Sequence, residues 1–93
     1  MAAARFIVSG TVQGVFYRAS TRDKAVSLGL SGIARNLSNG DVDVLAIGDG
    51  DRLDALERWL QSGPPMAVVT SVRREAVADG DLPVDPAEGF DIR

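Results

Sequence analysis

The residues best suited to chemistry lie in the stretch SGTVQGVFYRAST, residues 9–21, where two glycines precede an arginine. Arg18 falls in the first turn of the helix that the following residues predict. That turn carries the positive end of the helix macrodipole, so a cation there opposes the local field. Arg18 is therefore either a solvated surface residue beside a short glycine turn or part of a loop that binds an anion.

A turn of this kind can bind a phosphate. Glycines between a strand and a helix let several backbone N–H groups point into one concavity, and the helix dipole adds to them. The guanidinium of Arg18 offers a planar fork for two phosphate oxygens. The spacing from Gly10 to Gly14 is too short for a P-loop, no Lys-Ser/Thr follows, and GxGxxG is absent. The stretch therefore fits anion binding without matching a nucleotide motif.

Composition removes several classes of active site. The 93 residues include no cysteine and no histidine, which excludes disulfides, cysteine nucleophiles, imidazole bases, Ser-His-Asp triads and nearly all zinc sites. No apolar run approaches the ~18 residues of a membrane span, and the N-terminal residues make a poor signal peptide. We expect one domain, residues 1–93, in the cytoplasm and away from membranes.

The charge is unevenly distributed along the chain. Residues 1–36 hold five basic residues and one acid, whereas residues 37–93 hold five basic residues and twelve acids, for a net charge of −3. An acidic chain argues against nonspecific nucleic-acid binding, which needs a basic face. The positive half is the half that contains the glycine loop.

Apolar periodicity predicts the elements that must position this loop. A largely apolar strand over 5–12 is followed by a helical stripe that starts at Tyr17 and stops at Gly29. A second strand over 32–37 leads into Asn39-Gly40, a strong hairpin signal.

The second half repeats this pattern. The alternating run 41–47 predicts a strand, and a helix begins near Asp49 or Asp51 with a leucine stripe that stops at 63–65. A strand over 67–75 follows, with a bulge expected near Ser71. The last four residues can add a short strand. The order β-α-β-β-α-β, with a short final strand, predicts an α+β fold, the ferredoxin-like sandwich, with an antiparallel-type sheet and two helices on one face.

Four blocks of the chain carry a resemblance to a known family. VSGTVQGVFYR resembles the acylphosphatase signature V-x-G-x-V-Q-G-V-x-F/Y-R, and LGLSGIARNLSNGDVDV is similar to the family's L-G-L-x-G-W-V-R-N-x-x-x-G-x-V-E-V block. SGPPMAVV matches G-P-x-x-A-x-V, and FDIR matches F-x-I-R. The blocks keep the family's order and spacing over residues 6–93.

The resemblance implies an enzyme that hydrolyses the carboxyl–phosphate bond of small acyl phosphates without metal or organic cofactor. Inorganic phosphate would be its product and inhibitor, and we expect a monomer. By motif position, Arg18 would bind phosphate and Asn36 would position the attacking water. The remaining phosphate-binding loop would be the backbone of Gln13, Gly14, Val15, Phe16 and Tyr17.

The sequence departs from the family pattern at three positions. Ile33 replaces a frequent tryptophan and Ala34 replaces a valine, and both substitutions read as packing changes near Asn36. Thr11 stands where a basic residue is usual, which we expect to weaken the attraction of anions to the mouth of the loop. Neither Arg18 nor Asn36 is affected.

Other features have structural interpretations. Tyr17 and Trp59 lie on helical stripes and are expected to pack in the core. Asp49-Gly50-Asp51 and Asp79-Gly80-Asp81 resemble fragments of metal sites, but neither completes an EF-hand loop, so they are interpreted as a helix cap and a turn. Asn36 taken alone would be an ordinary strand-end residue.

Two other functions compete with a free-standing hydrolase. A noncatalytic phosphate-binding regulatory module would keep the loop and Arg18 but could dispense with Asn36. A domain of a larger carbamoyl-transfer protein is also possible. RNA binding is disfavoured because five aromatic residues without an RNP-like run give no stacking surface.

Overall fold

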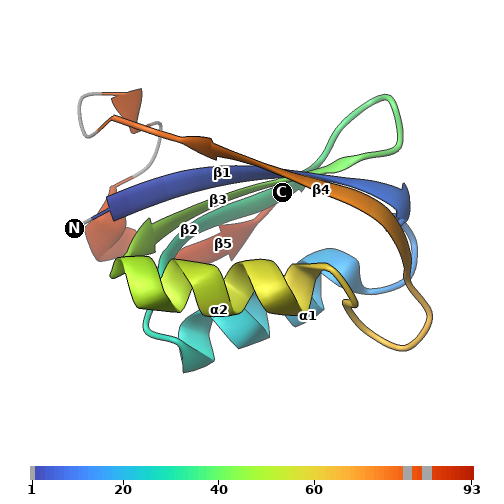
Figure 1. Ribbon diagram of the computed structural model, residues 1–93, viewed down its shortest axis with the longest axis horizontal. Helices are drawn as coiled ribbons and strands as arrows, with labels where there is room; N and C mark the ends of the chain where they lie inside the picture. The colour runs from blue at the N-terminus through green and yellow to red at the C-terminus, as the bar shows by residue number, and fades with distance from the viewer. Residues whose placement is uncertain (1, 79–80, 83–84) are drawn as a thin grey trace.

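The computed structural model describes residues 2–78, 81–82 and 85–93. Five strands form one sheet in the order β4-β1-β3-β2-β5, and both helices cover the same face of it (Figure 1). The predicted ferredoxin-like sandwich is thereby confirmed. In chain order the elements are β1 (Ala2–Thr11), α1 (Tyr17–Ser27), β2 (Ser31–Asn36), β3 (Val42–Gly48), α2 (Gly50–Leu60), β4 (Val68–Ala76), the short 3₁₀ helix η2 (Pro86–Glu88) and β5 (Phe90–Ile92).

The strand pairing places the end of β2 beside the C-terminal strand. β1 is antiparallel to β3 and β4, and β2 is antiparallel to β3. β5 is the exception, because it runs parallel to β2 and pairs Gly32 with Phe90 and Ala34 with Ile92. The sheet is therefore antiparallel except at this edge. Because β2 and β5 are parallel neighbours, Asn36 at the end of β2 and the last residues of β5 lie at the same end of the sheet.

Strand alternation separates a buried face from an open one. On β1, Phe6 and Val8 are fully buried beneath the helices, whereas Arg5 and Ile7 are only half-buried on the other face. The core side of β3 is formed by the predicted trio Val42, Val44 and Ala46. The helices complete the core with the stripes expected from their spacing: Tyr17, Thr21 and Ala25 on α1, and Leu53, Leu56 and Leu60 on α2.

The structure also confirms two local predictions. At the end of α1, the Gly29 N–H donates to the Val26 carbonyl and the Leu30 N–H to the Ala25 carbonyl. These two bonds form a Schellman motif, which ends the helix at the glycine as predicted. Between β1 and β4, Ser9 pairs with Ser71 but Gly10 pairs with Val69. The residue of β4 between Val69 and Ser71 has no partner on β1. This extra residue is the bulge expected near Ser71.

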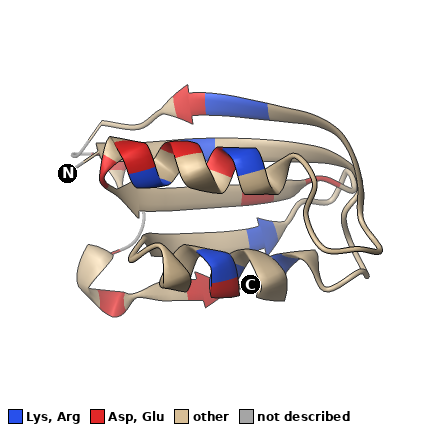
Figure 2. Ribbon diagram, turned by 60° about the horizontal axis from the view of Figure 1, so that its bottom comes forward, with Lys and Arg blue, Asp and Glu red and all other residues tan. Residues whose placement is uncertain are grey.

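The charge asymmetry of the sequence does not separate into two faces. The first-half strand β1 lies between β3 and β4 of the second half, and Figure 2 shows basic and acidic residues interspersed on both helices. In the described part of the chain, no helix is long and apolar enough to cross a membrane.

Candidate active site

The loop between β1 and α1 depends on two glycines for different reasons. Gly10 has φ +126°, and a Cβ there would collide with the Val68 carbonyl of β4. Strand β1 can therefore approach the bulged strand β4 only without a side chain at this position. Gly14 has φ +76°, a conformation that side chains disfavour, but the space around it is open. The loop thus bends at Gly14 while leaving its backbone accessible to a ligand.

The N-terminus of α1 is open to an anion. Phe16 is the N-cap residue, with no side-chain cap bond, and the first turn, which is fully described, contains no acidic residue. The first helical bond is donated by the Ser20 N–H to the Phe16 carbonyl. The N–H groups of the three preceding residues therefore have no intrahelical acceptor.

The second helix begins with the opposite charge. Asp49 is the N-cap residue of α2, and Asp51 lies in its first turn. Carboxylates at that end stabilise the helix dipole. Arg18 occupies the equivalent part of α1, which therefore lacks the stabilising negative charge that α2 carries in its own sequence.

Gln13 joins the loop to the β2–β3 hairpin. Its side-chain Nε2 donates to the carbonyls of Leu37 and Asp41, both at 2.8 Å. Leu37 directly follows Asn36, so this side chain fixes the distance between the loop and the end of β2. Sequence reasoning assigned Gln13 a backbone role and missed this contact, because no local pattern shows what the amide reaches.

A pocket of about 360 Å³ brings the main candidates together. Arg18 and Asn36 both line it, as do Gly14, Phe16 and Tyr17 of the loop. Among the described residues, Gln13 and Val15 are not part of its lining. The remaining lining residues are apolar: Val12, Ala19 and Ile92. The pocket therefore places a guanidinium, a side-chain amide and a helix N-terminus around one volume.

The C-terminal strand orients Arg18. One terminal nitrogen of its guanidinium, Nη1, donates to the backbone carbonyl of Arg93, directly after β5. An arginine has five N–H donors in a planar fork. One donor thus holds the group in place, and the remaining donors are available to a ligand.

Comparison with known proteins identifies the family. The acylphosphatase family model matches residues 4–92. The acylphosphatase of Xanthomonas euvesicatoria pv. vesicatoria (strain 85-10) is 58% identical over 90 residues, 97% of each chain. The chain belongs to the acylphosphatase family.

Solved structures agree with this assignment. An acylphosphatase from Coxiella burnetii superimposes with a TM-score of 0.88 at 41% identity, covering 99% of this chain and 92% of that one. The acylphosphatase from Bacillus subtilis gives a TM-score of 0.82 at 30% identity, with 100% and 99% covered. Both the fold and the enzyme class predicted from the sequence are confirmed: the chain is an acylphosphatase-type hydrolase.

The departures from the family pattern lie outside the pocket. Ile33 lies on the face of the sheet that the helices do not cover, although its side chain is largely buried there, and Ala34 is fully buried in the core on the other face. Thr11 is exposed at the end of β1, where it pairs with Val68. None of the three lines the pocket that contains Arg18 and Asn36.

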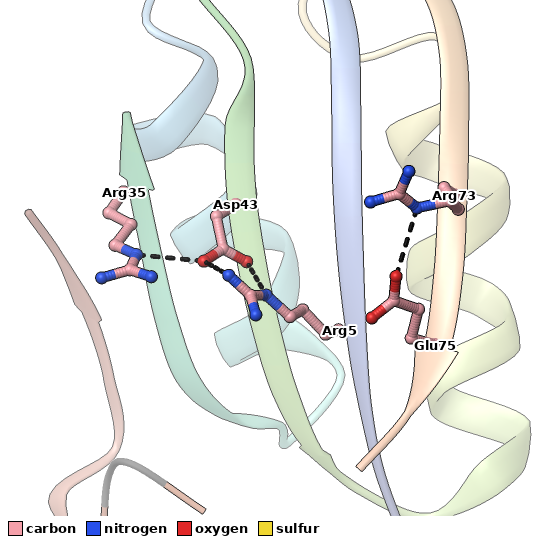
Figure 3. A network of polar contacts seen from close by, with 5 residues as sticks. All are labelled: Arg5, Arg35, Asp43, Arg73 and Glu75. Atoms are coloured by element: carbon pink, nitrogen blue, oxygen red, sulfur yellow. Dashed lines mark hydrogen bonds and ion pairs between the residues drawn. The ribbon is translucent and has the colours of Figure 1, made fainter. Parts of the chain in front are cut away.

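The open face of the sheet carries a compensated charge network (Figure 3). Arg5 binds Asp43 through Nε–Oδ1 at 2.8 Å and Nη2–Oδ2 at 2.7 Å, and Arg35 Nε reaches the same Oδ2 at 3.0 Å. Glu75 pairs with Arg73 at 3.2 Å. Two pockets on this face, about 450 and 720 Å³, share Arg5 and Glu75. The charged side chains of this network largely neutralise one another through these ion pairs, so we assign the network a structural role.

The two fragments that resemble metal sites have different outcomes. Asp49-Gly50-Asp51 forms the start of α2, as expected of a cap, although the Asp49 side chain makes no cap hydrogen bond. Asp79 and Gly80 lie outside the described residues. Within the described residues, no group of three or more Asp or Glu side chains converges as a metal site would require.

Tyr17 anchors the acylphosphatase loop to the core. Its ring is buried, as predicted, and lies 5.9 Å from the half-buried ring of Trp59. Its hydroxyl donates to the Leu60 carbonyl at 2.6 Å. Burial raises the pKa of the Tyr17 phenol well above its usual value, because the phenolate would lose its hydration.

We expect this phenol to make the protein sensitive to alkali. A pKa raised by folding contributes stability that is fully present below the unfolded-state value, about pH 10, and that is lost as the pH rises above it. Because the chain has one tyrosine and one tryptophan, tyrosinate absorbance and Trp59 fluorescence should change together as the protein unfolds. The Tyr17→Phe variant should lack this added alkaline sensitivity. Its free energy of unfolding at neutral pH should be lower by about 1 kcal/mol, because the hydrogen bond to the Leu60 carbonyl is lost. Titration of the phenol near pH 10 in the intact fold would contradict the assignment.

Proposed function

We propose that the chain hydrolyses acyl phosphates by direct attack of water on phosphorus, with Arg18 and the loop backbone holding the phosphoryl group and Asn36 orienting the water. One observation carries the proposal: Arg18 and Asn36 line the same pocket, at the N-terminus of α1, where the first turn contains no acidic residue. Phosphoryl transfer depends mainly on positioning and charge stabilisation. A helix N-terminus, backbone amides and a guanidinium provide both.

The proposed step breaks the bond between phosphorus and the carboxyl oxygen and forms a bond between phosphorus and the water oxygen. The bonding pair leaves with the carboxylate, a weakly basic leaving group that needs no general acid. An amide such as Asn36 is not a useful base, so the water proton goes to a phosphoryl oxygen. The products are a carboxylate and inorganic phosphate. With no cysteine or histidine, a phosphoenzyme on either side chain is excluded.

Hydrolysis of acetyl phosphate by the pure protein in excess EDTA tests the proposal. Release of acetate and phosphate is expected, with little hydrolysis of an ordinary phosphate ester such as phenyl phosphate. Activity that EDTA abolishes and a divalent metal restores would overturn the metal-free mechanism. Binding of inorganic phosphate without turnover of any acyl phosphate would instead favour the noncatalytic module.

The pH profile should follow the substrate. Without histidine, no unperturbed side chain titrates between pH 5 and 8. The phosphate monoanion and dianion interconvert at about pH 6 by analogy with phosphorylated side chains, so the profile of kcat/KM should bend where the substrate ionises. Two acyl phosphates with different phosphate pKa values should shift the bend by the difference between them. A bend that stays fixed would implicate a carboxylate of the protein.

A further inference from the structure

Phe16 combines exposure, an unfavourable backbone and a place at the pocket. Its side chain is 81% exposed, and its backbone has φ 61° and ψ 23°, in the left-handed region. It is the one non-glycine residue with positive φ in the described chain. Aromatic residues rarely adopt this conformation, and such outliers cluster at functional sites.

The fold does not use this side chain for its own stability. Four large apolar residues are exposed in the described chain: Phe16, Val26, Met66 and Val68. Among these four, only Phe16 lines the pocket of Arg18 and Asn36. The exposed ring is therefore available to whatever that pocket binds.

The pocket has two chemically different parts. Arg18 and the free N–H groups of α1 suit a phosphoryl group, whereas Phe16, Ala19 and Ile92 are apolar. An acyl phosphate has the same division, with a dianionic phosphoryl group at one end and an acyl group at the other. The apolar residues are the part of the lining suited to the acyl end.

We propose that Phe16 forms an acyl subsite that favours aromatic and other bulky apolar acyl phosphates over acetyl phosphate. This inference rests on the proposed function, because it assumes that the phosphoryl group occupies the Arg18 end. An acetyl group is too small to cover the ring, whereas a phenyl group can pack against it, in the offset or edge-on arrangements that aromatic pairs prefer. Phe16 acts here through its side chain, separately from its backbone in the loop.

The ratio of kcat/KM for benzoyl phosphate to that for acetyl phosphate tests the subsite. Phe16→Asn removes the ring but keeps a residue that tolerates the left-handed conformation. A disturbance of the phosphate loop affects both substrates and cancels in the ratio. The ratio should fall about 3- to 10-fold, the range of an aromatic pair, and Phe16→Leu should lower it less because it keeps apolar area. Met66→Ala, which removes an exposed apolar side chain outside the pocket, is the matched control.

Binding of non-hydrolysable analogues separates this inference from the hydrolase proposal. Phenacylphosphonate and acetonylphosphonate carry the same two acyl groups on a carbon–phosphorus bond, and calorimetry measures both. The wild-type protein should bind the phenacyl compound more tightly, and Phe16→Asn should lose that preference. If the preference is present but no acyl phosphate is hydrolysed, the subsite stands and the hydrolase mechanism fails. If wild type shows no preference, or if Met66→Ala loses it equally, the subsite is wrong.

Discussion

Arg18→Ala is expected to lower kcat/KM for acetyl phosphate by on the order of 10³, at the upper end of the effect of removing one preorganised donor. The guanidinium meets charge that is already present on the substrate, so ground-state binding should weaken as well. Inhibition by inorganic phosphate should therefore be lost together with turnover. Arg18→Lys should restore little of either, since an ammonium cannot replace a planar, bidentate fork.

Arg22→Ala provides the matched control for this experiment. Arg22 lies one turn further along α1, pairs with Asp23 at 3.5 Å and does not line the pocket. The Arg22→Ala substitution removes the same charge from the same helix as Arg18→Ala, so a general electrostatic effect would appear in both variants. Arg18 also bonds to the Arg93 carbonyl, so thermal melts must show that Arg18→Ala remains folded. Equal losses in the two variants would contradict a specific phosphate contact by Arg18.

The fold could be predicted because each of its elements has a local cause. Alternating valines formed β3, the leucine stripe formed α2, and Gly29 ended α1 in the expected way. Even the bulge near Ser71 could be inferred from a break in alternation. These features depend on residues close together in the chain, which is where period and turn chemistry carry information.

Long-range contacts of the site could not be predicted in the same way. The sequence pointed to Arg18 and Asn36, but it did not show that the Arg93 carbonyl would hold the guanidinium or that Gln13 would reach across to Leu37 and Asp41. These bonds join residues 24 to 75 positions apart. The left-handed backbone of Phe16 was also missed, because a phenylalanine gives no local signal for positive φ.

Asn36 should contribute to a different stage of the reaction from Arg18. Its side chain is exposed at the end of β2 and lines the pocket from there, outside the phosphate-binding loop. A water held by this amide becomes fully engaged only as the bond to phosphorus forms. An interaction made mainly in the transition state lowers kcat when it is lost and leaves ground-state binding almost unchanged.

Asn36→Ala is therefore expected to lower kcat by about 10² to 10³, or about 3 kcal/mol, as for other preorganised polar groups. Inhibition by inorganic phosphate should stay close to the wild-type value, in contrast to Arg18→Ala. Stability should change by less than about 0.5 kcal/mol, because an exposed strand-end side chain is removed. Asn39→Ala, in the adjacent hairpin turn and outside the pocket, controls for loss of an asparagine at this end of the sheet. Normal turnover by Asn36→Ala would remove this residue from the mechanism. A loss of phosphate binding as large as that of Arg18→Ala would show instead that Asn36 holds the phosphoryl group and not the water.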